Sequence, residues 1–130
     1  MIAIDTNIII RLLVQDDKSQ YQASRKLFTG ADDIFIADTV ILETAWVLQF
    51  AYEFESIAIC TALRKLFGLR NVRIANAQLV AQAIDWHEQG LDFADAFHLA
   101  LSQQLPSLKT FDDKFIKRAK KLTHCAVEKP

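Results

Sequence analysis

The sequence contains little of what flexible, secreted or membrane-spanning proteins need. Its 130 residues include only three glycines and two prolines, which leaves little material for flexible linkers. No apolar run approaches the roughly 18 residues that a membrane-spanning helix requires. The first residues lack the basic and apolar regions of a signal peptide. We therefore expect a single cytoplasmic domain over residues 1–130.

Several common site chemistries are also missing. The two cysteines, Cys60 and Cys125, are far apart, so we expect small buried side chains without a disulfide. The three histidines share no metal-ligand spacing and are expected in packing or surface roles. No glycine-rich phosphate loop is present, which disfavours P-loop and dinucleotide-binding folds. No serine sits in the sharp turn of a hydrolase nucleophile.

Short apolar runs alternate with segments of helical period. Residues 56–67 and 76–89 carry apolar side chains at a 3.6-residue period, which predicts helices. The short apolar runs predict strands covered on both faces, at residues 2–4, 34–37, 72–75, 107–110 and 125–127. This alternation predicts an α/β fold of three layers, with a central, mostly parallel sheet of about five short strands. Ligands bind at the carboxyl ends of the strands in such sheets.

Several acidic residues lie within apolar segments, where burial of a carboxylate costs free energy. Asp5 ends the first predicted strand in "MIAIDTNIIIRLL", and Glu43 interrupts the apolar helix "TVILETAWVL". Asp92 and Asp95 lie three residues apart in "LDFADAFHLALS". Two further acids, Asp112 and Asp113, follow the predicted strand 107–110 in "TFDDKF".

Few cations are available to these acids. There is no Lys or Arg between Gly30 and Tyr52 or between Gly90 and Leu108. A buried carboxylate is costly unless it is paired or binds a metal, and oxygen ligands suit Mg²⁺ or Mn²⁺. A purely structural explanation also exists, because most of these acids stand where they could cap the following helix.

In this order and spacing, the four segments resemble PIN-domain nucleases, and the small size resembles the VapC-type toxins of bacterial toxin–antitoxin pairs. The resemblance implies a PIN-like α/β fold and Mg²⁺- or Mn²⁺-dependent cleavage of RNA. It assigns the catalytic and metal-binding acids to Asp5, Glu43, Asp95 and Asp112, with Asp113 as the alternative for the fourth. It also implies supporting roles for neighbouring residues, namely Thr6, Asn7, Asp92, Thr110 and Asp113.

Two other functions fit the same motifs. One is a PIN nuclease that acts in RNA processing or on DNA, and the other is a binding module with a catalytically silent acidic pocket. The chemistry of the acids agrees with the nuclease hypothesis, because carboxylate-held metal ions can activate water and relieve charge on a leaving oxygen. No side-chain nucleophile is then needed.

The resemblance further implies an RNA substrate, a cognate antitoxin and a homodimer. The stretch "WVLQFAYEF" carries aromatic residues for an antitoxin or dimer surface, namely Trp46, Phe50, Tyr52 and Phe54. Alternatively, Trp46 and Phe50 belong to the core, while Tyr52 and Phe54 cover the next loop.

The net charge of −1 neither favours nor excludes a nucleic-acid partner, but the basic residues are unevenly distributed. Six of the fifteen basic residues fall within residues 109–121. Such a stripe could contact phosphates or could simply be a solvated helix face.

Overall fold

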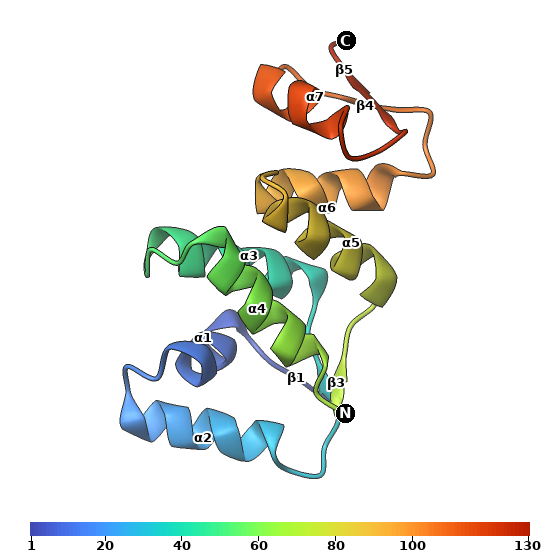
Figure 1. Ribbon diagram of the computed structural model, residues 1–130. Helices are drawn as coiled ribbons and strands as arrows, with labels where there is room; N and C mark the ends of the chain where they lie inside the picture. Colours follow the sequence, from blue (N-terminus) through green and yellow to red (C-terminus); the bar gives the residue numbers. More distant parts are fainter. The chain divides into compact units, whose positions relative to one another are not determined.

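The computed structural model describes all 130 residues, which form two compact units, Met1–Asn76 and Ala77–Pro130 (Figure 1). The first unit contains, in chain order, β1 (Ile2–Ala3), α1 (Thr6–Val14), α2 (Lys18–Phe28), β2 (Ile34–Phe35), α3 (Asp38–Phe50), α4 (Ser56–Phe67) and β3 (Val72–Arg73). The second contains α5 (Ala77–Glu88), α6 (Phe93–Ser102), β4 (Ser107–Lys109), α7 (Asp113–Ala119) and β5 (Ala126–Glu128).

The α/β class with five short parallel strands is confirmed, and the strands pair as a group of three and a group of two. All five strands lie within or next to the predicted runs. The helix predicted over residues 56–67 is α4, and the one predicted over 76–89 is α5. None of the seven helices combines the length and the apolar character needed to cross a membrane.

The first unit is built on the parallel sheet β1-β2-β3, with β2 in the middle. Ile34 of β2 pairs with Ile2 of β1 and with Val72 of β3. Because the strands are parallel and nearly in register, their carboxyl ends meet at one edge. The helices bury their apolar faces, and fully buried side chains include Ile34, Ile36, Ile41, Leu48, Ile59 and Leu63.

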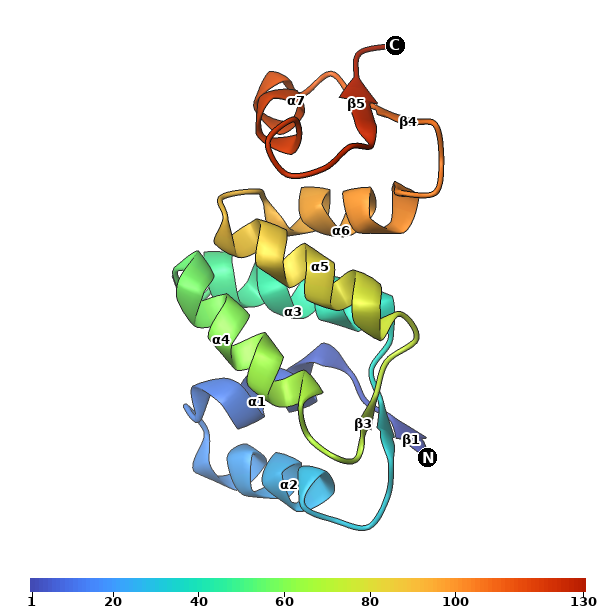
Figure 2. The same ribbon diagram turned by 45° about the vertical axis from the view of Figure 1, so that its right-hand side comes forward.

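The second unit consists of three helices and the parallel pair β4–β5, in which Leu108 faces Val127. Helices α5 and α6 lie side by side in both views (Figure 2). Between them, His87 and Phe93 meet edge to face with ring centroids 5.6 Å apart. The Nδ1 atom of His87 lies 2.7 Å from the Leu91 carbonyl oxygen, so this buried histidine has a packing role, as expected.

The other histidines are at the surface, as expected, whereas only one of the two cysteines is buried. His98 and His124 are exposed. Cys60 is buried in α4, Cys125 is half-buried, and neither forms a disulfide.

Candidate active site

In the first unit, the buried residue Thr6 bonds to two of the predicted acids, to Asp5 through its amide and to Glu43 through its hydroxyl. Asp5 follows β1 and caps α1, where its Oδ1 accepts a hydrogen bond from the Thr6 amide at 2.6 Å. The Thr6 side chain is 4% exposed, and its hydroxyl donates to Oε1 of Glu43 on α3. Glu43 is itself exposed, and Asn7 lies exposed in the first turn of α1. Thr6 therefore fixes the position of Glu43 relative to the turn that carries Asp5.

In the second unit, two caps position the acids at helix starts. Asp92 caps α6 through a bond from the Asp95 amide to its Oδ2 at 3.2 Å. Asp112 caps α7 through a bond from the Phe115 amide to its Oδ1 at 3.1 Å. The Asp112 amide in turn donates to the Thr110 hydroxyl at 3.1 Å. These bonds hold the acids at the junctions where the sequence predicted them.

The capping explanation for these acids is therefore correct for Asp5, Asp92 and Asp112. Each cap uses one carboxylate oxygen. The second oxygen of each carboxylate remains for another ligand, so a capping role and a ligand role are compatible.

Three of these carboxylates share one pocket in the second unit. Asp92, Asp95 and Asp112 line a pocket of about 370 Å³ together with four other residues, Leu91, Lys114, Phe115 and Arg118. Burial raises the pKa of the Asp95 carboxyl, and the nearby charges of Asp92 and Asp112 raise it further, while His98 opposes them. The pocket thus holds negative charge that is not fully compensated.

The two basic residues of this pocket do not pair with its acids. Neither Lys114 nor Arg118 forms an ion pair. The Nη1 of Arg118 donates instead to the carbonyl oxygen of Gly90 at 2.9 Å. The pocket therefore contains both carboxylates and basic side chains that are not paired with each other, so either can contact a ligand.

The neighbouring acids Asp112 and Asp113 have different surroundings. Asp113 forms an ion pair with Lys129 at 2.9 Å, and its side chain is 82% exposed. Only Asp112 lines the pocket. This arrangement favours Asp112 as the fourth acid.

The chemistry of the carboxylate donors suits a hard divalent ion. Within neither unit do three His, Cys, Asp or Glu side chains lie close enough together to hold a metal ion. The available donors are carboxylate oxygens, which Mg²⁺ and Mn²⁺ prefer. Burial and the charges of Asp92 and Asp112 raise the pKa of Asp95, and a cation bound beside it would favour the ionised carboxylate.

One acid at the sheet edge was missed from the sequence. Asp38 begins α3 just after β2, and its Oδ2 accepts a hydrogen bond from Asn76 Nδ2 at 3.1 Å. Its Oδ1 is buried without a hydrogen-bond partner. The available signal was its place directly after the predicted strand 34–37, the same position that singled out Asp5.

The aromatic stretch divides into an exposed and a half-buried pair. Trp46 and Phe50 are 59% and 58% exposed, and their ring centroids lie 5.3 Å apart. The alternative that placed these two residues in the core is therefore wrong. Tyr52 and Phe54 are half-buried, and the Tyr52 hydroxyl donates to Asp16 Oδ2 at 3.0 Å.

A second apolar surface lies between α1 and α4, where the sequence gave no indication of one. It is a groove of about 560 Å³, lined mostly by apolar side chains that include Leu12, Leu13, Ile57 and Leu66. Ile57 is 60% exposed there.

An α/β fold with carboxylates placed where strands end and helices begin is typical of metal-dependent hydrolases. The model of the PIN domain family matches residues 2–121, and the chain belongs to this family, whose members are typically metal-dependent nucleases. This match confirms the resemblance seen in the sequence motifs and spans both units.

Among solved structures, the chain is similar to the VapC20 toxin of Mycobacterium tuberculosis, a toxin that cleaves the sarcin–ricin loop. The two are 21% identical, and the match covers 97% of this chain and 99% of that one with a TM-score of 0.43. The comparison with curated proteins gave no match.

Proposed function

We propose that the protein is a metal-dependent endoribonuclease and the toxin of a toxin–antitoxin pair. It hydrolyses RNA phosphodiester bonds with four acids, Asp5, Glu43, Asp95 and Asp112. The observation that carries the proposal is the pocket in which Asp95 is half-buried beside Asp92 and Asp112 without an ion-paired cation. Uncompensated carboxylates of this kind are what a site for Mg²⁺ or Mn²⁺ requires.

The acids divide into ligands and supporting groups. Asp5 and Asp95 would hold the metal ion, and Glu43 and Asp112 would complete the site or orient water. When bound, the divalent ion supplies activation of water at neutral pH and charge relief on the leaving oxygen. No side-chain nucleophile takes part.

The chain's other residues keep these acids in position. The Thr6 hydroxyl restricts the Glu43 carboxylate, and the Thr110 hydroxyl accepts from the amide of Asp112. Asp92 holds the amide of Asp95 at the start of α6. Asp113 has a surface role, because it is paired with Lys129.

The proposed protein partners are an antitoxin and a second copy of the chain. An acidic pocket suits an Arg of the antitoxin, because its planar guanidinium pairs bidentately with carboxylates. For the other residues of the antitoxin, the first unit offers two apolar surfaces. These are the Trp46–Phe50 pair and the groove between α1 and α4. We assign the second copy to the exposed Trp46 and Phe50.

Growth of a bacterial host tests the proposal. Induced wild-type protein is expected to arrest growth, and Asp5→Asn and Asp95→Asn are expected to abolish the arrest at equal protein levels. Asp113→Asn is the matched control and should remain toxic. Co-expression of the small gene beside this one should restore growth. Undisturbed growth with active wild-type nuclease would instead support a role in RNA processing.

A further inference from the structure

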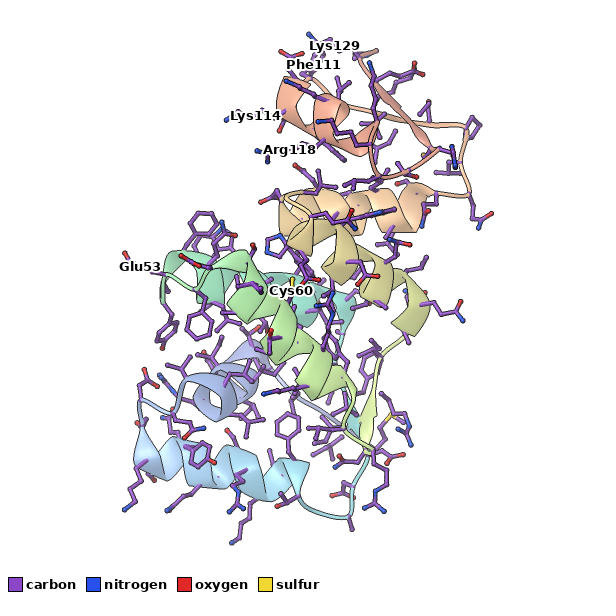
Figure 3. The ribbon with its side chains drawn as sticks, viewed as in Figure 1. Glu53, Cys60, Phe111, Lys114, Arg118 and Lys129 are labelled. Carbon is purple, nitrogen blue, oxygen red and sulfur yellow. The ribbon has the colours of Figure 1, made fainter.

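The basic residues of the second unit fall into paired and unpaired groups. Lys109 forms an ion pair with Glu128 at 2.8 Å. Lys114 and Arg118 form none and stand one turn apart on α7, which places them on the same side of the helix. Figure 3 shows both side chains projecting from that side of α7, away from β4 and β5. Both residues also line the acidic pocket, so these cations lie beside its carboxylates.

An exposed aromatic ring precedes this helix. Phe111 is 80% exposed and directly precedes Asp112, which lines the pocket. Hydrogen bonds join the residues on either side of Phe111. The Asp112 amide donates to the Thr110 hydroxyl, and the Asp112 carboxylate caps α7. A single exposed apolar residue is ordinary on a protein surface. Phe111 differs from a scattered surface residue in its place in the chain, directly before Asp112 and three residues before Lys114, both of which line the pocket.

We propose that Phe111, Lys114 and Arg118 form a subsite for one unpaired nucleotide next to the phosphate that is cleaved. Phe111 stacks on the base, and Lys114 and Arg118 contact phosphate oxygens of the strand. The inference rests on the proposed ribonuclease function and specifies its substrate as RNA with an accessible, unstacked base at this position. Aromatic stacking on splayed bases is a general mode of recognition for single-stranded RNA.

Electrostatics favours a nucleic-acid strand on this surface. A phosphodiester that approaches Asp92, Asp95 and Asp112 is repelled, so binding requires positive charge beside the acids. Lys114 offers an ammonium group that no carboxylate of the protein occupies. Arg118 is oriented by the Gly90 carbonyl through Nη1, which leaves its other N–H groups for a phosphate.

Binding of RNA by the full chain in EDTA tests the subsite without cleavage. The probe is a fluorescent single-stranded RNA, followed by anisotropy over a series of KCl concentrations. Phe111→Ala is expected to weaken binding about five- to hundred-fold, whereas Phe111→Trp keeps the affinity. Lys114→Gln and Arg118→Gln should each weaken binding and flatten the salt dependence by about 0.7 in the log–log slope.

Two controls separate recognition from structural effects. Lys120→Gln makes the same charge change at the C-cap of α7, where Lys120 lines a different pocket, and should leave the affinity nearly unchanged. An RNA with an abasic nucleotide at the stacked position should bind wild type and Phe111→Ala equally well, since the interaction with the ring is then absent in both. Phe111→Ala should unfold at the wild-type temperature, because the ring is exposed.

The outcomes distinguish this inference from the proposed function. If wild type cleaves RNA but the three variants bind it like Lys120→Gln, the subsite is wrong and the nuclease stands. If the variants behave as expected but wild type cleaves no RNA, the three residues bind RNA, but the nuclease and the placement of the subsite beside a cleaved phosphate are wrong. If Phe111→Ala alters only the molecular mass in light scattering, the ring belongs to a protein interface and the subsite is wrong.

Discussion

The hydroxyl of Thr6 donates a hydrogen bond to Oε1 of Glu43, 37 residues further along the chain. Thr6 directly follows the acid that ends β1, and Glu43 lies on α3. Thr6 thus contacts both acids that we propose as catalytic in the first unit, Asp5 through its amide and Glu43 through its hydroxyl. The same pair of elements, α1 and α3, packs together in the core.

Replacing Thr6 tests whether this link matters for activity. Thr6→Val keeps the shape but removes the donor, so Glu43 loses its fixed position. We expect cleavage to fall about 10- to 100-fold, as for other residues that orient a metal site. Stability should fall by about 1–2 kcal/mol in chemical denaturation. Thr6→Ser retains the hydroxyl and should keep most of the activity, and equal activity of Thr6→Val and wild type would show that the link is only structural.

Metal ions should stabilise the folded protein. At a Mn²⁺ concentration about 100 times its Kd, linkage contributes about 2.7 kcal/mol. For a chain of this size, that raises the melting temperature by several degrees. Asp5→Asn and Asp95→Asn should reduce the shift, whereas Asp113→Asn should retain it because Asp113 is paired with Lys129. A melting temperature that does not respond to millimolar Mn²⁺ would count against the metal site.

The raised pKa of Asp95 predicts a pH-dependent stability of the metal-free protein. Burial and the charges of Asp92 and Asp112 disfavour the ionised form in the folded state relative to the unfolded chain. The folded state therefore becomes less stable as the pH rises from below 3.8, the ordinary value, through the raised pKa. Asp95→Asn removes this penalty, so it should melt higher than wild type at pH 7 in EDTA. The difference should shrink as both proteins are acidified toward pH 4, and a constant difference would contradict the assignment.

Self-association should depend on the exposed rings of α3. Glu43, Trp46 and Phe50 lie on one exposed face of this helix, and aromatic residues are enriched at protein interfaces. We expect a dimer at micromolar concentration in multi-angle light scattering, and a shift to monomer in Trp46→Ala and Phe50→Ala. Ile57→Ala, at the groove between α1 and α4, is the control and should stay dimeric. A monomeric wild type would exclude this interface.

Helix extents and the acids at strand ends were predictable from sequence, because neighbouring residues in the chain determine both. The period of apolar residues predicted the full extent of α4, since Ile59, Cys60 and Leu63 all face the core. The acids at strand ends were equally visible, because a polar residue after a short apolar run both ends the strand and caps the next helix. Asp5 and Asp112 lie at such junctions.

Features that depend on distant partners were not predictable. Apolar residues occur on all sides of α3, so its sequence left open whether Trp46 and Phe50 face outward or belong to the core with Ile41 and Leu48. The partner of Asp38 is Asn76, which follows β3, and this pairing requires knowing that β2 and β3 are neighbours. Likewise, the ion pair between Asp113 and Lys129 joins residues that lie on α7 and after β5, and neither segment alone indicates it.

Cleavage of RNA in vitro tests the central claim most directly. Purified wild type and three variants, Asp95→Asn, Asp112→Asn and Asp113→Asn, are incubated with labelled RNA in Mn²⁺ or in EDTA. Asn replaces Asp as a helix cap almost without loss, so Asp112→Asn should stay folded while it loses a ligand charge. We predict cleavage by wild type and Asp113→Asn in Mn²⁺ only, and a loss of at least about 100-fold in Asp95→Asn and Asp112→Asn. Cleavage that persists in EDTA, or at the wild-type rate in Asp95→Asn, would contradict the assignment of this protein as a metal-dependent ribonuclease that uses these acids.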